Sequence, residues 1–266
     1  LGGRRVIGRA ETDDFWHWPD PSVVLQPGSQ FPPTVDFYNS VYVPYPGDGY
    51  RLEAGAIDRR GRFHLMFPSV YHRETDSVDV YLAVSRDGLN WTFPERRPVF
   101  PLGPEGSGRG GMIYASPSLV KLAEDQWALL VSATDRLHDA DNPPGYQGYT
   151  MWWASWKPDR LVALEASVEG SVTLHERECQ GETLTVNFET KPHGWIRMEL
   201  IDRAIYPATQ VKPLEGFSFA ECEPLQGDEP CAQVRWNGSS SLASLKGKRL
   251  CVRVQLRQAK LFSFSL

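Results

Sequence analysis

The chain has 266 residues, of which 41% are hydrophobic and 23% are charged, proportions that are typical of a soluble globular protein and exclude a disordered one. The formal net charge of −5 excludes a basic surface for nucleic acid or for an anionic membrane. No apolar run reaches the roughly 18 residues that a membrane-spanning helix needs.

The first five residues lack the apolar core of a signal peptide, and no initiator Met is present. We therefore expect a processed chain or a fragment, and the cellular compartment stays open. Aromatic residues make up 12% of the chain, beside 21 Pro and 23 Gly, and no window shows apolar residues at helical spacing. Short strands, many turns and aromatic plugs predict an all-β protein.

From the N-terminus, residues 1–10 end a strand that leads into a turn at residues 12–18. The same pattern of a hydroxyl residue, an Asp two positions on and a Trp six positions on returns at residues 85–91. The Asp or Ser side chain of such a turn bonds backbone N–H groups two residues on, and Gly88 supplies a positive φ. We expect each Trp to pack as a plug between hairpins, and the two copies predict a repeated β-unit.

Between the two turns, a short strand is expected at residues 22–25 and a longer one at 35–43. In the longer strand, two-residue alternation places Asp36 and Tyr38 on one face, and Phe37 and Asn39 on the other. A hairpin is expected from a strand at residues 54–57 and a second at 63–67, joined by an Asp- and Gly-containing turn. Residues 118–122 and 127–132 repeat this hairpin.

After Ala166 the pattern changes to clean alternation between turns. Strands are expected at residues 167–174, 184–187, 195–201, 250–256 and 260–266. This pattern predicts an antiparallel β-sandwich, so we expect a first domain at residues 1–166 and a second at 167–266.

Four cysteines lie in the last third of the chain, without CxxC spacing, and the histidines are scattered. No metal site and no cofactor are therefore expected. Either Cys222 and Cys231 form a disulfide, or all of Cys179, Cys222, Cys231 and Cys251 are buried thiols. The inward alternation of Cys251 favours thiols.

Several motifs together resemble five-bladed β-propeller glycosidases, the glycoside hydrolase families 32, 43 and 68. In the first domain they are residues 36–39 (DFYN), 65–69 (LMFPS), 85–91 (SRDGLNW) and 111–115 (GMIYA). In the second they are 194–202 (GWIRMELID), 245–250 (LKGKRL) and 261–264 (LFSF), as in bacterial proteins of this type. The resemblance implies a propeller followed by a β-sandwich, as in family 32.

The resemblance also implies which parts this chain lacks. A complete five-bladed propeller takes about 300 residues, so the 166 residues before the sandwich predict a partial propeller without its first two blades. The family's nucleophile or base lies in a Trp-Asn-Asp-Pro-like motif on the first blade, and no stretch of this sequence matches it. The open blade edges of a partial propeller predict a homo-oligomer.

The function implied by the resemblance is that of a glycosidase, which acts on a terminal sugar through two facing carboxyl groups. Asp36 is the first catalytic candidate, with Glu53 and Glu105 as weaker ones; alternatively, Asp36 caps a turn and the two glutamates are solvated loop charges. The candidate sugar-binding residues are Tyr38, Asn39, His72, Arg73, Tyr114 and His138. The alternative function is a non-catalytic carbohydrate-binding or assembly module.

Overall fold

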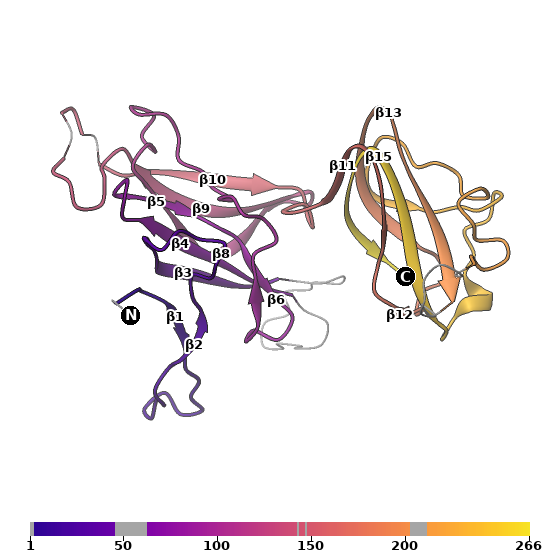
Figure 1. Ribbon diagram of the computed structural model, residues 1–266, viewed down its shortest axis with the longest axis horizontal. Helices are drawn as coiled ribbons and strands as arrows, with labels where there is room; N and C mark the ends of the chain where they lie inside the picture. The colour runs from indigo at the N-terminus through magenta and orange to yellow at the C-terminus, as the bar shows by residue number, and fades with distance from the viewer. Residues whose placement is uncertain (1–2, 46–62, 143, 147, 203–211) are drawn as a thin grey trace. The chain divides into compact units, whose positions relative to one another are not determined.

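The computed structural model describes residues 3–45, 63–142, 144–146, 148–202 and 212–266. The chain divides into two compact units, Leu1–Trp156 and Lys157–Leu266 (Figure 1). Within the described ranges the regular structure is β-strand, apart from the short 3₁₀ helix η2 (Ala243–Leu245), which confirms the all-β prediction. None of the helices in these ranges has the length and hydropathy needed to cross a membrane.

The first part of unit 1 is an antiparallel meander. Its strands follow one another as β3 (Val35–Tyr45), β4 (Phe63–His72), β6 (Ala83–Ser85) and β7 (Trp91–Thr92). Strand β5 (Ser77–Val80) pairs with the C-terminal end of β4. Residues 65–71 of β4 and all four residues of β5 are buried, so this part of the sheet is covered on both faces, whereas burial alternates from Val41 to Tyr45 in β3.

A second antiparallel meander follows, with strands β8 (Met112–Ala123), β9 (Gln126–Thr134) and β10 (Thr150–Trp156). A parallel pairing of Val78 in β5 with Met112 in β8 joins the two meanders into one eight-stranded sheet.

We expected the strand at residues 63–67 to form a hairpin with a strand at 54–57, but in the structure it pairs with other strands. Residues 64–66 pair with β3 on one side and with β6 on the other, so the hairpin partner of β4 is β3. Strand β3 continues to Tyr45, which lies opposite Phe63. Because β3 and β6 pair with the two sides of residues 64–66, neither edge of this part of β4 is free. The expected strand at 54–57 lies outside the described residues.

A separate two-stranded sheet, β1 (Ile7–Arg9) and β2 (Ser22–Leu25), flanks the first copy of the repeated turn. The two copies have the same hydrogen bonds, which confirms the predicted side-chain bonding within the turn. Asp14 Oδ1 accepts the backbone N–H groups two and three residues on, each at 2.8 Å, and Asp87 Oδ1 accepts the equivalent pair at 2.9 and 2.8 Å. The two closing indoles also bond alike, each to the carbonyl three residues earlier, at 3.0 and 3.2 Å.

The two turns differ in their exposure and in one backbone position. Trp91 is half-buried and packs near Tyr42, with ring centroids 6.4 Å apart, as expected of a plug. Trp18 is 54% exposed, so the expectation that it is a plug is wrong within the described structure. Phe15 occupies the position of Gly88, with φ of 68° against 71° for the glycine. A bulky side chain in this left-handed region is strained.

Replacement of Phe15 by glycine is therefore expected to raise the free energy of unfolding by about 1 kcal/mol, because glycine adopts a positive φ at no steric cost. Gly88→Ala should have the opposite effect, since its Cβ would lie 3.0 Å from Arg9 Nη1 at a φ of 71°. Urea denaturation of both variants checks this pair. A loss of stability in Phe15→Gly would contradict the strain argument and show that the exposed ring makes a stabilising contact.

Unit 2 contains one five-stranded antiparallel sheet. The strand order is β11 (Leu164–Thr173), β15 (Arg249–Ser265), β13 (Thr185–Asp202) and β14 (Asp228–Gln233), and β12 (Arg177–Glu178) also pairs with β15. Apolar side chains of β13 and β15 are buried together with residues from 214–245. The β-sandwich that we expected has two sheets, whereas the described residues of unit 2 show one sheet and its core.

Two pairs of strands that we expected to be separate are each continuous in unit 2. Apart from Leu184 and Leu266, segments 184–187 and 195–201 both belong to β13, and 250–256 and 260–266 both belong to β15. The pairing register of these two strands shifts between Thr190 and Trp195, opposite Gln258, which has a φ of 45°. A bulge of this kind lets a strand continue through irregular residues, so the Pro192–Gly194 stretch does not end it.

The start of unit 2 precedes the boundary expected at residue 166. Arg160 Nε donates to Asn187 Oδ1 at 2.7 Å, and its guanidinium pairs with Asp228 at 2.5 Å. Lys157 Nζ lies 2.7 Å from the same carboxylate. The hydrogen bonds from these two cations, of which that from Lys157 has the larger effect, hold the pKa of Asp228 below its usual value. The residues just after Trp156 are thus tied to the sheet of unit 2.

All four cysteines are free thiols in the structure. Cys179, Cys222 and Cys251 are buried, which agrees with the inward alternation of Cys251, but Cys231 is exposed. The expectation that all four are buried is therefore wrong for Cys231, which lies on β14 at the edge of its sheet. Burial raises the pKa of the Cys179 and Cys222 thiols, so both stay protonated at neutral pH.

Candidate functional site

Four aromatic rings from separate parts of unit 1 meet near the ends of β3, β4 and β8. We call Tyr38, Tyr71, Tyr114 and His138 the tyrosine–histidine cluster. The His138 ring centroid lies 4.9 Å from that of Tyr38 and 4.7 Å from that of Tyr71. The Tyr38 ring also lies 6.4 Å from Tyr114 and 6.5 Å from Tyr71. Tyr38 is thus the central ring, and it is 39% exposed.

A β-bulge in β3 accompanies this position of Tyr38. Phe37 pairs with Val70 and Asn39 with Ser69, so Tyr38 is the extra residue on its strand. Because Val70 and Ser69 are consecutive, Phe37 and Asn39 lie on opposite faces of the sheet. Our expectation that they share a face is therefore wrong. The sequence of residues 35–43 alternates without a break, so it gives no sign of the bulge.

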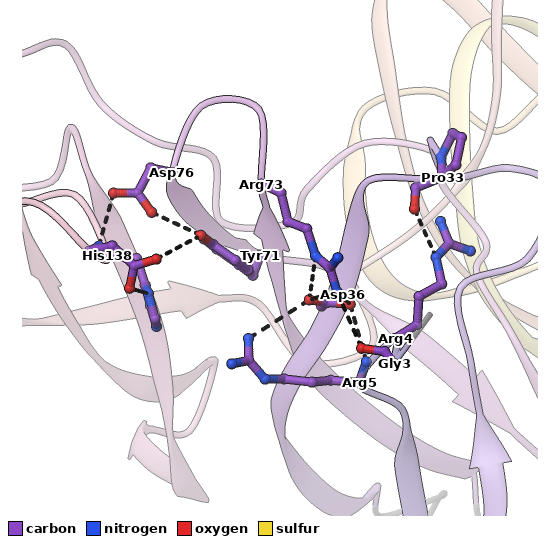
Figure 2. A network of polar contacts seen from close by, with 10 residues as sticks. Gly3, Arg4, Arg5, Pro33, Asp36, Tyr71, Arg73, Asp76 and His138 are labelled. Carbon is purple, nitrogen blue, oxygen red and sulfur yellow. Dashed lines mark hydrogen bonds and ion pairs between the residues drawn. The ribbon is translucent and has the colours of Figure 1, made fainter. Parts of the chain in front are cut away.

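Two carboxylates surround the hydroxyl of Tyr71 (Figure 2). It donates to Asp76 Oδ1 at 2.9 Å and lies 3.4 Å from Asp139 Oδ2. His138 Nδ1 lies 2.7 Å from Asp139 Oδ1, and the backbone N–H of Asp139 donates to Asp76 Oδ2 at 2.9 Å. Asp76, His138 and Asp139 thus present ligand-type atoms within 4.8 Å of one another, a spacing that a metal ion could bridge.

The hydroxyls of Tyr71 and Tyr114 stay protonated over a wide pH range. Desolvation, followed by the hydrogen bond to Asp76, raises the pKa of Tyr71 to about 12. Desolvation also raises the pKa of Tyr114 to about 12. The Tyr114 hydroxyl lies 3.3 Å from Met112 Sδ, a weak acceptor. Both hydroxyls are therefore hydrogen-bond donors at neutral pH.

Asp36 is buried, with an exposed fraction of 1%, and both of its oxygens are bonded (Figure 2). Arg73 donates to them from Nε and Nη2, each at 2.9 Å, and also from Nη2 to the carbonyl of Gly3 at 3.3 Å. The backbone N–H of Arg5 donates to Asp36 Oδ1 at 3.1 Å, and the Arg5 guanidinium lies 4.8 Å from the centre of the Tyr38 ring. Asp36 therefore fixes the N-terminal segment beside the cluster.

The other predicted site residues lie in different surroundings. His72 follows Tyr71 on β4, so its side chain points to the opposite face, where its Nε2 lies 2.9 Å from Asp79 Oδ1. Asn39 is exposed next to Tyr38, and Glu105 is exposed on the loop that precedes β8. Glu53 lies outside the described residues.

The structure thus brings together three of the predicted binding residues, Tyr38, Tyr114 and His138, and pairs a fourth, Arg73, with Asp36. It adds Tyr71, Asp76, Asp139 and Arg5, which our sequence reasoning did not select. Comparison of the chain with known protein families, curated proteins and solved structures gives no match. The functional argument therefore depends on the residues and their geometry.

Proposed function

We propose that unit 1 is carbohydrate-active and binds a terminal sugar at the tyrosine–histidine cluster. The observation that carries the proposal is the partly exposed ring of Tyr38, which lies among other rings and beside charged groups. Small-molecule sites combine aromatic surface with a few placed polar groups that fix orientation. A pyranose has the matching pattern, since its C–H face is apolar and its rim carries hydroxyls.

The polar groups around Tyr38 suit sugar hydroxyls. Asp139 is exposed and its carboxylate accepts hydrogen bonds, and the Arg5 guanidinium on the Tyr38 ring offers donors. His138 lies between this ring and the Asp139 carboxylate. A ligand stacked on Tyr38 would therefore have both acceptors and donors at its edge.

The strand order is consistent with the expected glycosidase-like scaffold. The meander of β3, β4, β6 and β7 has the four antiparallel strands of a propeller blade, and β8, β9 and β10 match the first three strands of another. In this proposal the two meanders are blades of a partial propeller, and the cluster lies where they adjoin, at the pairing of β5 with β8.

Hydrolysis of a glycosidic bond is the second candidate, and one observation favours it. One oxygen of Asp76 lies no more than 4.8 Å from one oxygen of Asp139, so the two carboxyl groups are close enough for the pair, roughly 5 Å apart, that a retaining glycosidase uses. Asp139 is the exposed member and suits the nucleophile, and Asp76, whose oxygens accept the Tyr71 hydroxyl and the Asp139 backbone N–H, is the facing carboxyl group. Asp36, the first catalytic candidate from the sequence, is better suited to positioning, because Arg73 and Arg5 engage both of its oxygens.

Tyr38→Ala is expected to weaken sugar binding at least tenfold, a loss of about 1.4 kcal/mol, because the stacking surface is removed. Isothermal titration calorimetry with a panel of methyl glycosides and short oligosaccharides measures the effect. Tyr42→Ala is the matched control: it lies on the same strand, is 51% exposed and contacts His64 instead of the cluster. Equal losses in both variants, or no binding by the parent across the panel, would reject the proposal.

Aryl glycosides separate binding from hydrolysis. If the protein is an enzyme, Asp139→Asn should abolish release of the aryl group while sugar binding persists, and Asp36→Asn should reduce it less. A parent protein that binds sugars without releasing the aryl group would leave the non-catalytic carbohydrate-binding module as the function.

A further inference from the structure

Strand β10 is an unprotected edge of the eight-stranded sheet (Figure 1). All seven of its residues pair with β9, from Thr150 opposite Ala133 to Trp156 opposite Trp127. On its other side, no described residue forms a backbone hydrogen bond with it. Its row of N–H and C=O groups is thus available to another strand.

The sequence of β10, TMWWASW, has none of the features that usually protect an edge. It contains no charged residue, no proline and no glycine. The edge strands of unit 2 differ: β14 carries Asp228, Glu229 and Pro230, and β11 carries two glutamates and a glycine. Charge and proline at an edge prevent pairing with another chain. The short edge strands β2 and β7 also lack these features, so β10 is the longest edge strand in the described part of the chain that is left without them.

The side chains of β10 fit a second copy of the same strand. In an antiparallel pair centred on Trp153, Trp152 lies opposite Ala154 of the partner subunit, and Met151 opposite Ser155 of the partner subunit. Trp152 and Met151 thus each meet a small side chain, Trp153 meets its own counterpart, and no like charges meet. Met151 and Trp153 are 56% and 47% exposed on one face, so cross-strand contacts in the pair would reduce the exposure of both.

We propose that two copies of this chain associate through β10 across a two-fold axis, which continues the sheet of one copy into the other. The interface is isologous, so Trp153 lies opposite its own counterpart at the axis. This proposal stands apart from the sugar site, because it uses neither the tyrosine–histidine cluster nor its carboxylates.

The symmetry gives a charge-swap test by sedimentation equilibrium at micromolar concentration. The parent chain should be a dimer, and Trp153→Lys and Trp153→Glu should each be monomeric, because like charges meet at the axis. A mixture of the two variants should recover a dimer, since opposite charges then meet there. This recovery also shows that both variants are folded.

Val168→Lys is the control, because Val168 is 74% exposed on β11 in unit 2. It should leave the dimer intact. A monomeric parent, dimers that survive both Trp153 substitutions, or a mixture that stays monomeric would each overturn the proposal.

Discussion

Arg73→Ala is expected to lower the free energy of unfolding of unit 1 by about 2–3 kcal/mol, because it removes the main partner of a buried carboxylate. Asp36 keeps only the contacts with Arg5 once Arg73 is lost. Full burial of both partners would give a larger effect, but the Arg73 side chain is 46% exposed. Urea denaturation, followed by hydrogen exchange of β3 and β4, measures the loss and assigns it to this unit.

A matched surface arginine and a double-mutant cycle make this prediction specific. Arg97 forms an ion pair with Glu95 on the surface, and the Arg97 side chain is 77% exposed. Arg97→Ala should therefore lower the free energy of unfolding by less than about 1 kcal/mol. In an Asp36→Asn background, Arg73→Ala should cost less than it does alone, because no buried charge is then left unpaired. Additive losses would show that Arg73 stabilises the fold without acting through Asp36.

Local chemistry accounts for what could be predicted from the sequence of unit 1. The Asp-and-Trp turns follow from side-chain bonds within a few residues, and they form at residues 12–18 as well as 85–91. Alternation likewise predicts a strand around Asp36. Neither signal gives the strand partner of β4, because β3 and the expected strand at 54–57 both have suitable alternation and only the assembled sheet decides between them.

The candidate site was predictable only in part, for the same reason. Tyr38 and Tyr114 lie in strands, and His138 in a loop, that the sequence itself indicates. Each could therefore be chosen as a candidate binding residue without knowledge of the others. The contact of Asp76 and Asp139 with Tyr71 depends on how the loop after β4 meets the loop after β9, 63 residues further along the chain. No spacing rule links residues so far apart, and Asp139 was therefore not selected.

Phe67 illustrates a further limit of alternation, since Phe63 and Phe67 are four residues apart on β4 and share a face by period two. Phe67 is nevertheless fully buried and stacks on Phe100, with ring centroids 5.9 Å apart. Phe63, at the start of the strand, is 41% exposed under the Arg86 guanidinium. The position along the strand, which alternation does not report, therefore decides which ring belongs to the core.

Phe67→Ala is accordingly expected to destabilise unit 1 by about 3–5 kcal/mol, since it removes a buried ring and leaves a cavity that the sheet cannot close. Phe63→Ala, the same substitution on the same strand, should cost less than about 1 kcal/mol because its ring already contacts solvent. Calorimetry of both variants, with hydrogen exchange to separate unit 1 from unit 2, provides the comparison. Similar losses for the two would mean that Phe67 is not part of a close-packed core, and the packing of β4 in this sheet would have to be reassigned.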